Sequence, residues 1–449
     1  MSVPSAQTGR VAALRARYEP QLASLRESDT AKAAGLAGAM IANNVIALGS
    51  TVVFARLLSD YGSLAALISY FLILSVVGQA LQVATAREGV LGHLGVGEGL
   101  LATMRNWMRT LALFTLALTV ISILLRQPIA DAVGVKHDAW AAAIGLPAGC
   151  LWLALSILRG ALQGVGDYKS VGYSLIGEQA MRLITGAALA AIGLGVTGAY
   201  LGTPLSFIAM GVYCTVQLRR YASAHPPAVA TERHTVDLWT HVRMAWAPIA
   251  GLIVIAVLQN IDIIAAKHRF TGTKDLASSY AATAVAAKVL IWVAICAGFY
   301  LVPEVSRRKA AGEDTRPVLA KALLIILVCA VPVLLIFVFG HTPLLRIAFG
   351  RNRLLASSSL PILGVAFTVL AATYLAIQYM LALKRTWFLV LLAAVAVSEP
   401  VLLLQASRNP TGFAAVVLGV QAVGAVVAFA LALHRDGARP TPAVNPEPA

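Results

Sequence analysis

Charged side chains inside long apolar stretches are the residues of this sequence that can carry chemistry. Glu178 and Arg182 lie four residues apart in one such stretch, so a helix would place them on one face, where they can pair. One interpretation is a structural pair that orders the helix. The other is a cation that lines a cavity and meets an anionic group, because Arg182 can give a phosphate two parallel hydrogen bonds.

Asp262 is a second charged residue of this kind, next to Gln259 and Asn260 in a later apolar stretch. It is interpreted as a site that couples transport to a proton or cation, as a hydrogen-bonded contact between helices, or as an acid near water at the end of a span. Lys288 lies deep inside the following stretch, where it either pairs with Asp262 or points into a cavity.

The remaining candidates lie at a proline or at the ends of apolar stretches. Glu399 precedes Pro400, which interrupts the backbone hydrogen bonds, so we expect a kink with a locally solvated acid or, alternatively, a contact to substrate. Arg56, Arg87 and Arg159 either ring the mouth of a cavity or act only as topology signals.

Enzyme signatures are not found in the sequence. It has no nucleophile with a matching base, no phosphate-binding glycine loop and no metal-ligand spacing. We therefore predict no enzyme activity, no catalytic residue, no cofactor and no metal. An ATP-driven pump is disfavoured, and the expected driving force is an ion gradient or the gradient of the substrate itself.

Composition indicates that lipid surrounds most of the chain. Of the 449 residues, 59% are hydrophobic and 12% are charged, and the mean hydropathy is +0.79. Water-soluble domains carry about twice that share of charge. The net charge of +15 comes from basic residues scattered over short loops, a distribution typical of membrane topology. Because these residues are not gathered on one soluble face, we expect no nucleic-acid partner.

A membrane-spanning helix needs about 20 apolar residues, and this length predicts twelve spans. They run over Ala33–Phe54, Leu64–Ala84, Met108–Leu125, Ala139–Leu158, Val171–Ile192, Val196–Val216, Met244–Ala266, Ala277–Leu301, Val318–Phe339, Ser357–Leu383, Trp387–Leu404 and Thr411–Leu433. The predicted fold is an all-α polytopic membrane protein with two six-helix lobes around a central cavity.

The loops predict an orientation and a division of the chain. Lys and Arg are concentrated in the tails and in the loops on the same side as the tails, so both termini are expected in the cytoplasm. The expected parts are a cytoplasmic N-terminal segment, a first lobe, a cytoplasmic linker, a second lobe and a disordered cytoplasmic tail. They cover residues 1–32, 33–218, 219–243, 244–433 and 434–449.

The two predicted lobes resemble each other near their first spans. NNVIALGSTVVFARLLSDYG begins at Asn43, QNIDIIAAKHRFTGTKDLAS begins at Gln259, and both place amides inside a span and a basic residue at its end. Such a parallel repeat is typical of transporters that rock two bundles around a central site. The small-residue pair Gly160 and Gly164 predicts close helix packing.

Several stretches resemble a known family. They are VFARLLSDYG after the first span, ALQVATAR over 80–87, RGALQGVGDYKSVGYSLIGEQAMRL over 159–183, and YLVPEVSRR over 300–308. These segments are similar to the polysaccharide-exporter branch, the Wzx-type oligosaccharide flippases, of the multidrug/oligosaccharidyl-lipid/polysaccharide (MOP) flippase superfamily. The stretch over 159–183 is the most specific of them.

This resemblance implies a multi-pass protein of the bacterial cytoplasmic membrane that turns an undecaprenyl-diphosphate-linked oligosaccharide from the inner to the outer leaflet by alternating access. Arg182 and Lys288 would then neutralise the diphosphate or acidic sugars. Expected partners are the lipid-linked glycan, membrane lipids and a glycan polymerase or glycosyltransferase. The murein-precursor flippases of the superfamily typically carry two further helices.

Two other functions stay open from the sequence. A cation-coupled drug or metabolite antiporter of the same superfamily should carry its coupling acid in the first lobe, where Asn43 and Asn44 stand instead. A non-transporting membrane scaffold of glycan assembly is the other alternative. A cluster of Arg182, Lys288 and Asp262 around one cavity would argue against the scaffold.

Overall fold

The computed structural model describes residues 29–224, 238–244, 246–272 and 274–434, and those residues are almost entirely helical, without a β-strand. Eleven continuous helical stretches in this part of the chain are long and apolar enough to cross a membrane. One of them, 168–224, folds back at a kink and therefore crosses twice. The described residues thus make twelve crossings, which confirms the predicted all-α polytopic fold.

The first six crossings form the N-lobe. Its elements are α2 (Asp29–Leu57), α3 (Tyr61–Val90), α4 (Glu98–Leu124), the short α5 (Arg126–Val133), α6 (Ala139–Gly164), α7 (Tyr168–Leu189), the π-helical turn η1 (Ala190–Leu194) and α8 (Gly195–Ala224). Local signals set the helix boundaries: Asp60 and Asp167 accept hydrogen bonds from backbone amides in the first turns of α3 and α7. Gly193, with a φ of 104°, allows the reversal between α7 and α8.

The second six crossings form the C-lobe. Its elements are α9 (Leu238–Met244), α10 (Trp246–Arg269), α11 (Lys274–Ala287), α12 (Val289–Ala310), α13 (Arg316–Phe349), the short turns η2 (Arg351–Arg353) and η3 (Ser357–Ser359), α14 (Leu360–Ala382), α15 (Phe388–Gln405) and α16 (Pro410–Leu433). The single span predicted over Ala277–Leu301 is interrupted at Lys288, which separates α11 from α12.

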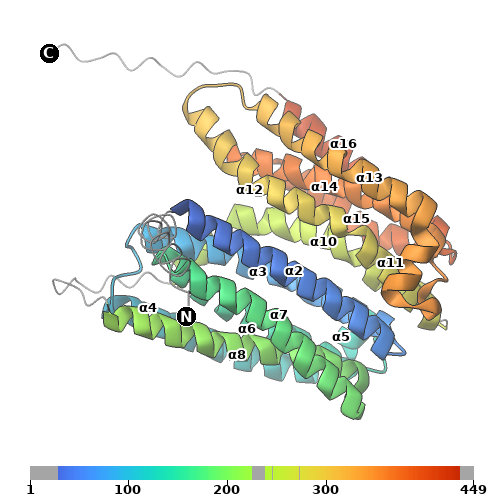
Figure 1. Cartoon of the computed structure of the whole chain (residues 1–449), viewed down its shortest axis with the longest axis horizontal. Helices are drawn as coiled ribbons and strands as arrows, with labels where there is room; N and C mark the ends of the chain where they lie inside the picture. The colour runs from blue at the N-terminus through green and yellow to red at the C-terminus, as the bar shows by residue number, and fades with distance from the viewer. Residues whose placement is uncertain (1–28, 225–237, 245, 273, 435–449) are drawn as a thin grey trace, which may run out of the picture.

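Figure 1 shows the two lobes lying side by side, with the start of α2 and the end of α16 near one end of the bundle. We call the end at which α2 begins and α16 ends the terminal face. The opposite end, at which α2 and α13 end, is the closed face, because the lobes are hydrogen-bonded to each other there. Of the predicted parts 1–32, 219–243 and 434–449, residues 1–28, 225–237 and 435–449 lie outside the described residues.

Two arginines join the lobes at the closed face, each binding the last carbonyls of a helix in the opposite lobe. Arg56, in the last turn of α2, donates from Nε to the Ala348 carbonyl oxygen at 3.2 Å and from Nη2 to Ile347 at the end of α13. A helix ends with carbonyls that lack partners and carries partial negative charge there. Arg56 therefore caps α13 across the interface.

The second arginine, Arg353, does the same in the opposite direction. It follows α13 and donates to the carbonyl oxygens of Ala55, Leu58 and Ser59 at 3.2, 2.6 and 3.1 Å, at the end of α2. Its side chain is 6% exposed, so these bonds are sheltered from water. We call Arg56 and Arg353 the arginine latch.

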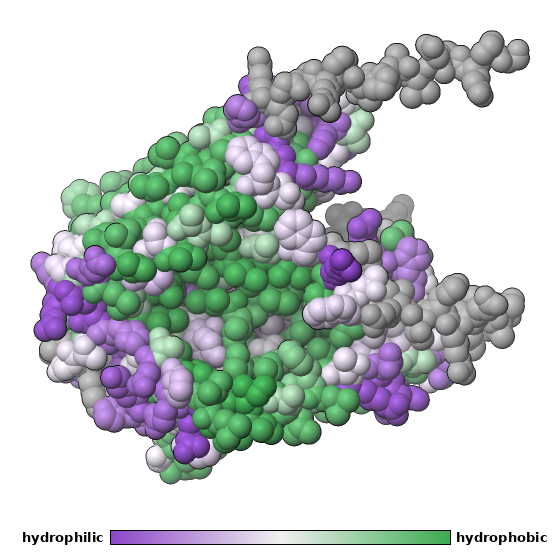
Figure 2. Space-filling view, turned by 180° about the vertical axis from the view of Figure 1, so that it is seen from behind, coloured by the Kyte–Doolittle hydropathy of each residue, from purple (hydrophilic) through white to green (hydrophobic). Residues whose placement is uncertain are grey.

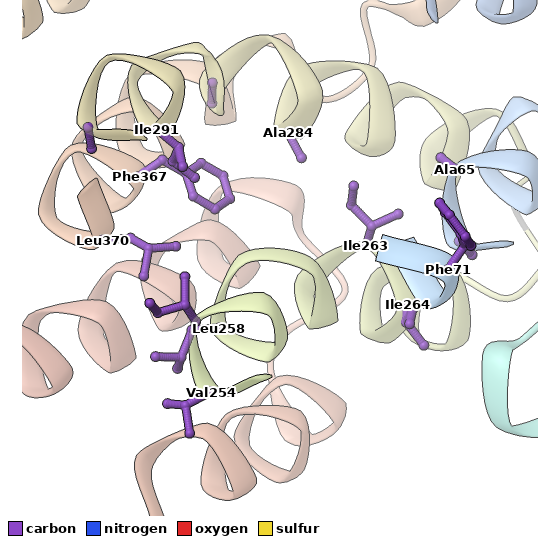
Figure 3. Close-up of a cluster of buried hydrophobic side chains, with 14 of the residues drawn as sticks. Ala65, Phe71, Val254, Leu258, Ile263, Ile264, Ala284, Ile291, Phe367 and Leu370 are labelled. Atoms are coloured by element: carbon purple, nitrogen blue, oxygen red, sulfur yellow. The ribbon is translucent and has the colours of Figure 1, made fainter. Parts of the chain in front are cut away.

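Side chains and helix packing extend the lobe contact from the latch toward the middle of the bundle. Lys267 at the end of α10 binds Asp60 at 2.7 Å, and the Gly62 amide donates to the Ser278 hydroxyl at 2.9 Å. Helix α3 packs along α10 and α11. Figure 3 shows Ile264 of α10 on the side where Phe71 of α3 lies.

The surface agrees with a membrane position and with separation of the lobes at the terminal face. Figure 2 shows a broad hydrophobic band between polar regions at the two ends of the bundle. In the same view the surface is hollowed between the lobes at the terminal face. The inter-lobe hydrogen bonds and the ion pair described above all lie at the opposite end.

Candidate functional site

The first charged cluster, which we call the arginine cluster, lies in the N-lobe between α6 and α7. Arg159 Nη1 lies 3.0 Å from Glu178 Oε2, and Arg182 Nη2 lies 3.1 Å from Glu178 Oε1. The spacing of Glu178 and Arg182 allowed them to pair, and the structure shows that they do. Glu178 thus forms ion pairs with two guanidinium groups, and the three side chains together carry one excess positive charge.

Arg159 does not lie at the mouth of a cavity, contrary to the interpretation based on its place near a span end. It is fully buried, with Nε donating to the Ser174 hydroxyl at 2.7 Å and Nη2 to the Ser174 carbonyl oxygen at 2.8 Å. Its guanidinium also lies over the Trp152 ring at 5.5 Å. The tight turn at Gly166 folds the end of α6 onto the start of α7, and this packing buries the Arg159 side chain.

Arg182 is held less completely than Arg159. Its guanidinium lies 5.9 Å from the Phe71 ring centre and 5.5 Å from that of Phe207, and 16% of its side chain is exposed. Its Nε and the buried Tyr200 hydroxyl have no hydrogen-bond partner among the described residues. Because buried polar groups normally find partners, this part of the arginine cluster retains unused donors.

The second cluster, which we call the acid cluster, lies in the C-lobe. Lys288 Nζ lies 3.0 Å from Asp262 Oδ1, and the Tyr280 hydroxyl lies 3.4 Å from Asp262 Oδ2. Of the two positions considered for Lys288, the structure shows the pair with Asp262. The break between α11 and α12 places Lys288 beside α10, and its ammonium also lies 5.1 Å from the Phe367 ring centre.

Glu399 of α15 completes the acid cluster, and its surroundings differ from the solvated acid that was expected. The residue is fully buried despite the neighbouring Pro400, and its Oε1 accepts a hydrogen bond from Gln421 Nε2 of α16 at 3.1 Å. The same Nε2 donates to the Leu258 carbonyl oxygen of α10 at 2.9 Å. The helices around Pro400 close over the acid and exclude water.

The charges of the acid cluster do not balance one another. Asp262 and Glu399 bring two carboxylates, and Lys288 brings one ammonium group. Oε2 of Glu399 has no hydrogen-bond partner among the described residues. Isolated charges are costly to bury, so the cluster becomes neutral only when it also takes up one proton or one small cation.

The other predicted arginines do not join either cluster. Arg56 belongs to the arginine latch at the closed face. Arg87 is exposed in the last turn of α3, at the terminal face. Arg182 and Lys288 lie in different lobes, one in each cluster, so these residues do not form the single group that would have argued against a scaffold.

Three residues of these sites were missed by sequence reasoning. Arg353 lies in a predicted loop, where an arginine is expected as a topology signal. Tyr200 and Gln421 lie inside predicted spans. The sequence does contain a signal for Gln421, because an amide within the very apolar stretch Thr411–Leu433 needs a buried hydrogen-bond partner.

Metal binding finds no support in the side chains that the structure places. Within residues 29–224, 238–244, 246–272 and 274–434, no group of three or more His, Cys, Asp and Glu side chains is arranged to hold a metal ion. The two clusters instead combine arginine, lysine and single carboxylates. The cluster in the N-lobe carries an excess of positive charge, and the cluster in the C-lobe carries an excess of carboxylates.

Twelve crossings in two lobes, with a charged cluster buried in each, define a two-lobed polytopic membrane protein. No protein-family model and no curated protein sequence matches the chain. Solved structures do match it. A structure titled "Lipid II flippase MurJ, inward closed conformation" aligns with a TM-score of 0.68 at 16% identity, covering 88% of this chain and 87% of that chain.

Two further solved structures share this architecture. An inward-facing multidrug resistance MATE family transporter of the MOP superfamily aligns with a TM-score of 0.66 at 12% identity, over 87% of this chain and 93% of that one. The eukaryotic MATE transporter AtDTX14 aligns with a TM-score of 0.57 at 14% identity, over 90% and 96%. This chain therefore has the fold of MOP-superfamily flippases and transporters.

Proposed function

We propose that this protein is a membrane transporter that flips a lipid-linked oligosaccharide, with an undecaprenyl diphosphate as the carrier, by alternating access. The observation that carries the proposal is the excess positive charge of the arginine cluster inside the membrane. Intramembrane charge is expensive and tends to mark the path of a substrate. The shared fold with a lipid II flippase supports a lipid-linked substrate.

The arginine cluster suits a diphosphate in particular. A planar guanidinium can donate two parallel hydrogen bonds to a phosphate, and Arg182 has an unused Nε beside the free Tyr200 hydroxyl. Glu178 holds Arg159 and Arg182 in place without neutralising both. The aromatic rings of Phe71 and Phe207 limit hydration around Arg182 and so strengthen its attraction for an anion.

The arrangement of the lobes corresponds to one state of the transport cycle. If the terminal face is cytoplasmic, as the distribution of basic residues predicts, the separated lobes face the cytoplasm and the arginine latch seals the outer side. Outward opening then requires Arg56 and Arg353 to leave the helix ends that they cap. Rocking of the lobes about α3, α10 and α11 would exchange the two states.

The acid cluster is proposed to couple this movement to protons. Asp262, Lys288 and Glu399 balance their charges only with an additional proton or small cation, and Lys288 sits at the break between α11 and α12. A change of charge at this break can shift the preferred packing of α11 on α3. An antiporter would use the same cluster, so substrate identity has to separate the two functions.

The decisive experiment measures lipid-linked oligosaccharide in a deletion strain complemented with variants of verified expression. We expect glycan to accumulate on the cytoplasmic side in the deletion strain and in the Arg182→Gln strain, whereas wild type clears it. Arg182→Lys should restore clearance only in part, because it keeps the charge but loses the paired hydrogen bonds. Arg307→Gln is the matched control, since 62% of that side chain is exposed.

The outcomes separate the competing functions. Normal glycan levels together with altered sensitivity to small cationic compounds would support the antiporter. Glycan defects in the deletion strain that Arg182→Gln and Lys288→Met fully complement would support a scaffold that does not transport. A glycan polymerase or glycosyltransferase, the proposed partner, should remain active on its substrate in membranes of the Arg182→Gln strain.

A further inference from the structure

The N-lobe carries an apolar groove on its outer side, and no charged residue of either cluster lines it. Helices α4 and α8 each pack on α6 but touch one another little, so they diverge above it. The groove above α6 is floored by Leu151 and has two adjoining hollows that share Met108 and Leu151. One, of about 430 Å³, is lined by α4, α6 and α8, and the other, of about 360 Å³, is lined by α4 and α6. Each hollow has the size of a small-ligand pocket.

The lining of this groove is apolar in effect, although it contains threonines. Thr115 donates to the Leu111 carbonyl oxygen at 2.7 Å, and Thr215 donates to that of Gly211 at 2.8 Å. The hydroxyl groups of both threonines therefore already donate hydrogen bonds within their own helices, and they need no polar ligand. The groove suits a hydrocarbon chain.

Positive charge marks one end of the groove. Arg219 lines it near the end of α8, and Arg105 lies one turn before Met108 on the same face of α4. Both arginines are exposed and belong to the terminal-face half of their helices. Guanidinium groups at this depth meet the phosphates of the lipid head groups.

The length of the groove matches one leaflet. Twelve residues separate Phe207 from Arg219 along α8, a distance of about 18 Å at the helical rise of about 1.5 Å per residue. Half of a bilayer's hydrocarbon core is about 15 Å thick. An acyl chain of a bilayer phospholipid fits this length, whereas an undecaprenyl chain is far longer.

We infer that the α4–α6–α8 groove binds a resident anionic phospholipid, with one acyl chain along Leu151 and Phe207 and its phosphate between Arg105 and Arg219. This inference does not rest on the proposed transport function. Phe207 connects the two regions, because it lines the groove and also lies 5.5 Å from the Arg182 guanidinium. The bound lipid would therefore support one wall of the arginine cluster.

The test measures phosphatidylglycerol retained after reconstitution in equimolar phosphatidylcholine and phosphatidylglycerol, followed by native mass spectrometry. Gly211→Leu should block the groove, because a side chain there meets no protein atom within 4 Å. We expect it and the double variant Arg105→Ala, Arg219→Ala to lower retention about tenfold. Gly419→Leu is the matched control, since Gly419 has equally open space on α16 outside the groove.

Three results would overturn the assignment. The first is retention that equals wild type in both the blocked and the arginine variants. The second is equal retention of phosphatidylcholine and phosphatidylglycerol by the wild type, which removes the role of Arg105 and Arg219. The third is displacement of phosphatidylglycerol by undecaprenyl phosphate at equal concentration, which would assign the groove to the substrate's tail.

Discussion

At the scale of single residues, two arginines from different helices hold Glu178 of α7: Arg182 from the same helix and Arg159 from α6. Glu178 and Arg182 could be paired from their spacing, because a helix fixes the geometry of residues four apart. Arg159 reaches the same carboxylate from α6. Its burial depends on how α6 and α7 pack, which no local pattern records.

The buried pair of Lys288 and Asp262 leads to a prediction about stability. Lys288→Met should lower the free energy of unfolding by about 3–5 kcal/mol, because it leaves Asp262 charged and unpaired in an apolar setting. Adding Asp262→Asn should recover most of the loss. Thermal melting of purified protein in detergent measures both, with the exposed Lys321→Met as the control.

A double variant whose destabilisation equals the sum of the two single losses would show that Lys288 and Asp262 are not coupled. The single variant Asp262→Asn is needed for this comparison.

At the scale of elements, hydropathy located the spans well, because each must cross the same thickness of lipid. Departures arise where the chain is apolar without being a single straight helix. The break at Lys288 falls inside an apolar stretch, and α13 continues past the predicted end at Phe339 to Phe349. The short α5 is too polar and too brief to be detected by this criterion.

Close packing of α3 on α6 leads to a second stability prediction. A Cβ at Gly160 would lie 2.5 Å from the Gln82 carbonyl oxygen of α3, and Gly164 lies against Gly89. Gly160→Val should therefore destabilise the N-lobe by at least about 1–3 kcal/mol through overpacking. Thermal melting in detergent is the measurement.

Gly38→Val is the control for this variant, because Gly38 is an exposed helical glycine with no atom within 4 Å of an added Cβ. It introduces the same β-branched side chain into a helix. Equal melting temperatures for the two variants would contradict the proposed role of α3–α6 contact. The close approach itself was predictable from the spacing of Gly160 and Gly164, although its partner helix was not.

At the scale of the whole molecule, the ion pair between Asp60 and Lys267 makes closure of the lobes sensitive to acid. Burial raises the pKa of the Asp60 carboxyl, but the hydrogen bonds and charge of Lys267 outweigh this and hold it below its ordinary value of 3.8. The pair thus favours closure at and above that pH. Its contribution is lost as the pH falls through the lowered pKa.

Spin labels at Lys136→Cys and Arg351→Cys, exposed positions near the closed face of the two lobes, would report this change as a distance distribution. We expect a longer distance to gain population only below about pH 4. Asp60→Asn keeps a capping side chain for α3 but removes the charge. It should show the longer distance already at neutral pH, and a profile identical to wild type would contradict the prediction.

The arginine latch also has a consequence for solvent. When Arg56 and Arg353 leave the ends of α13 and α2, the carbonyl oxygens that they cap lose these donors and require water molecules in their place. Opening of the closed face therefore requires hydration of these carbonyl oxygens in addition to a rigid-body movement of the lobes. Lower water activity, as imposed by an excluded osmolyte, should therefore favour the arrangement in which the arginine latch is closed.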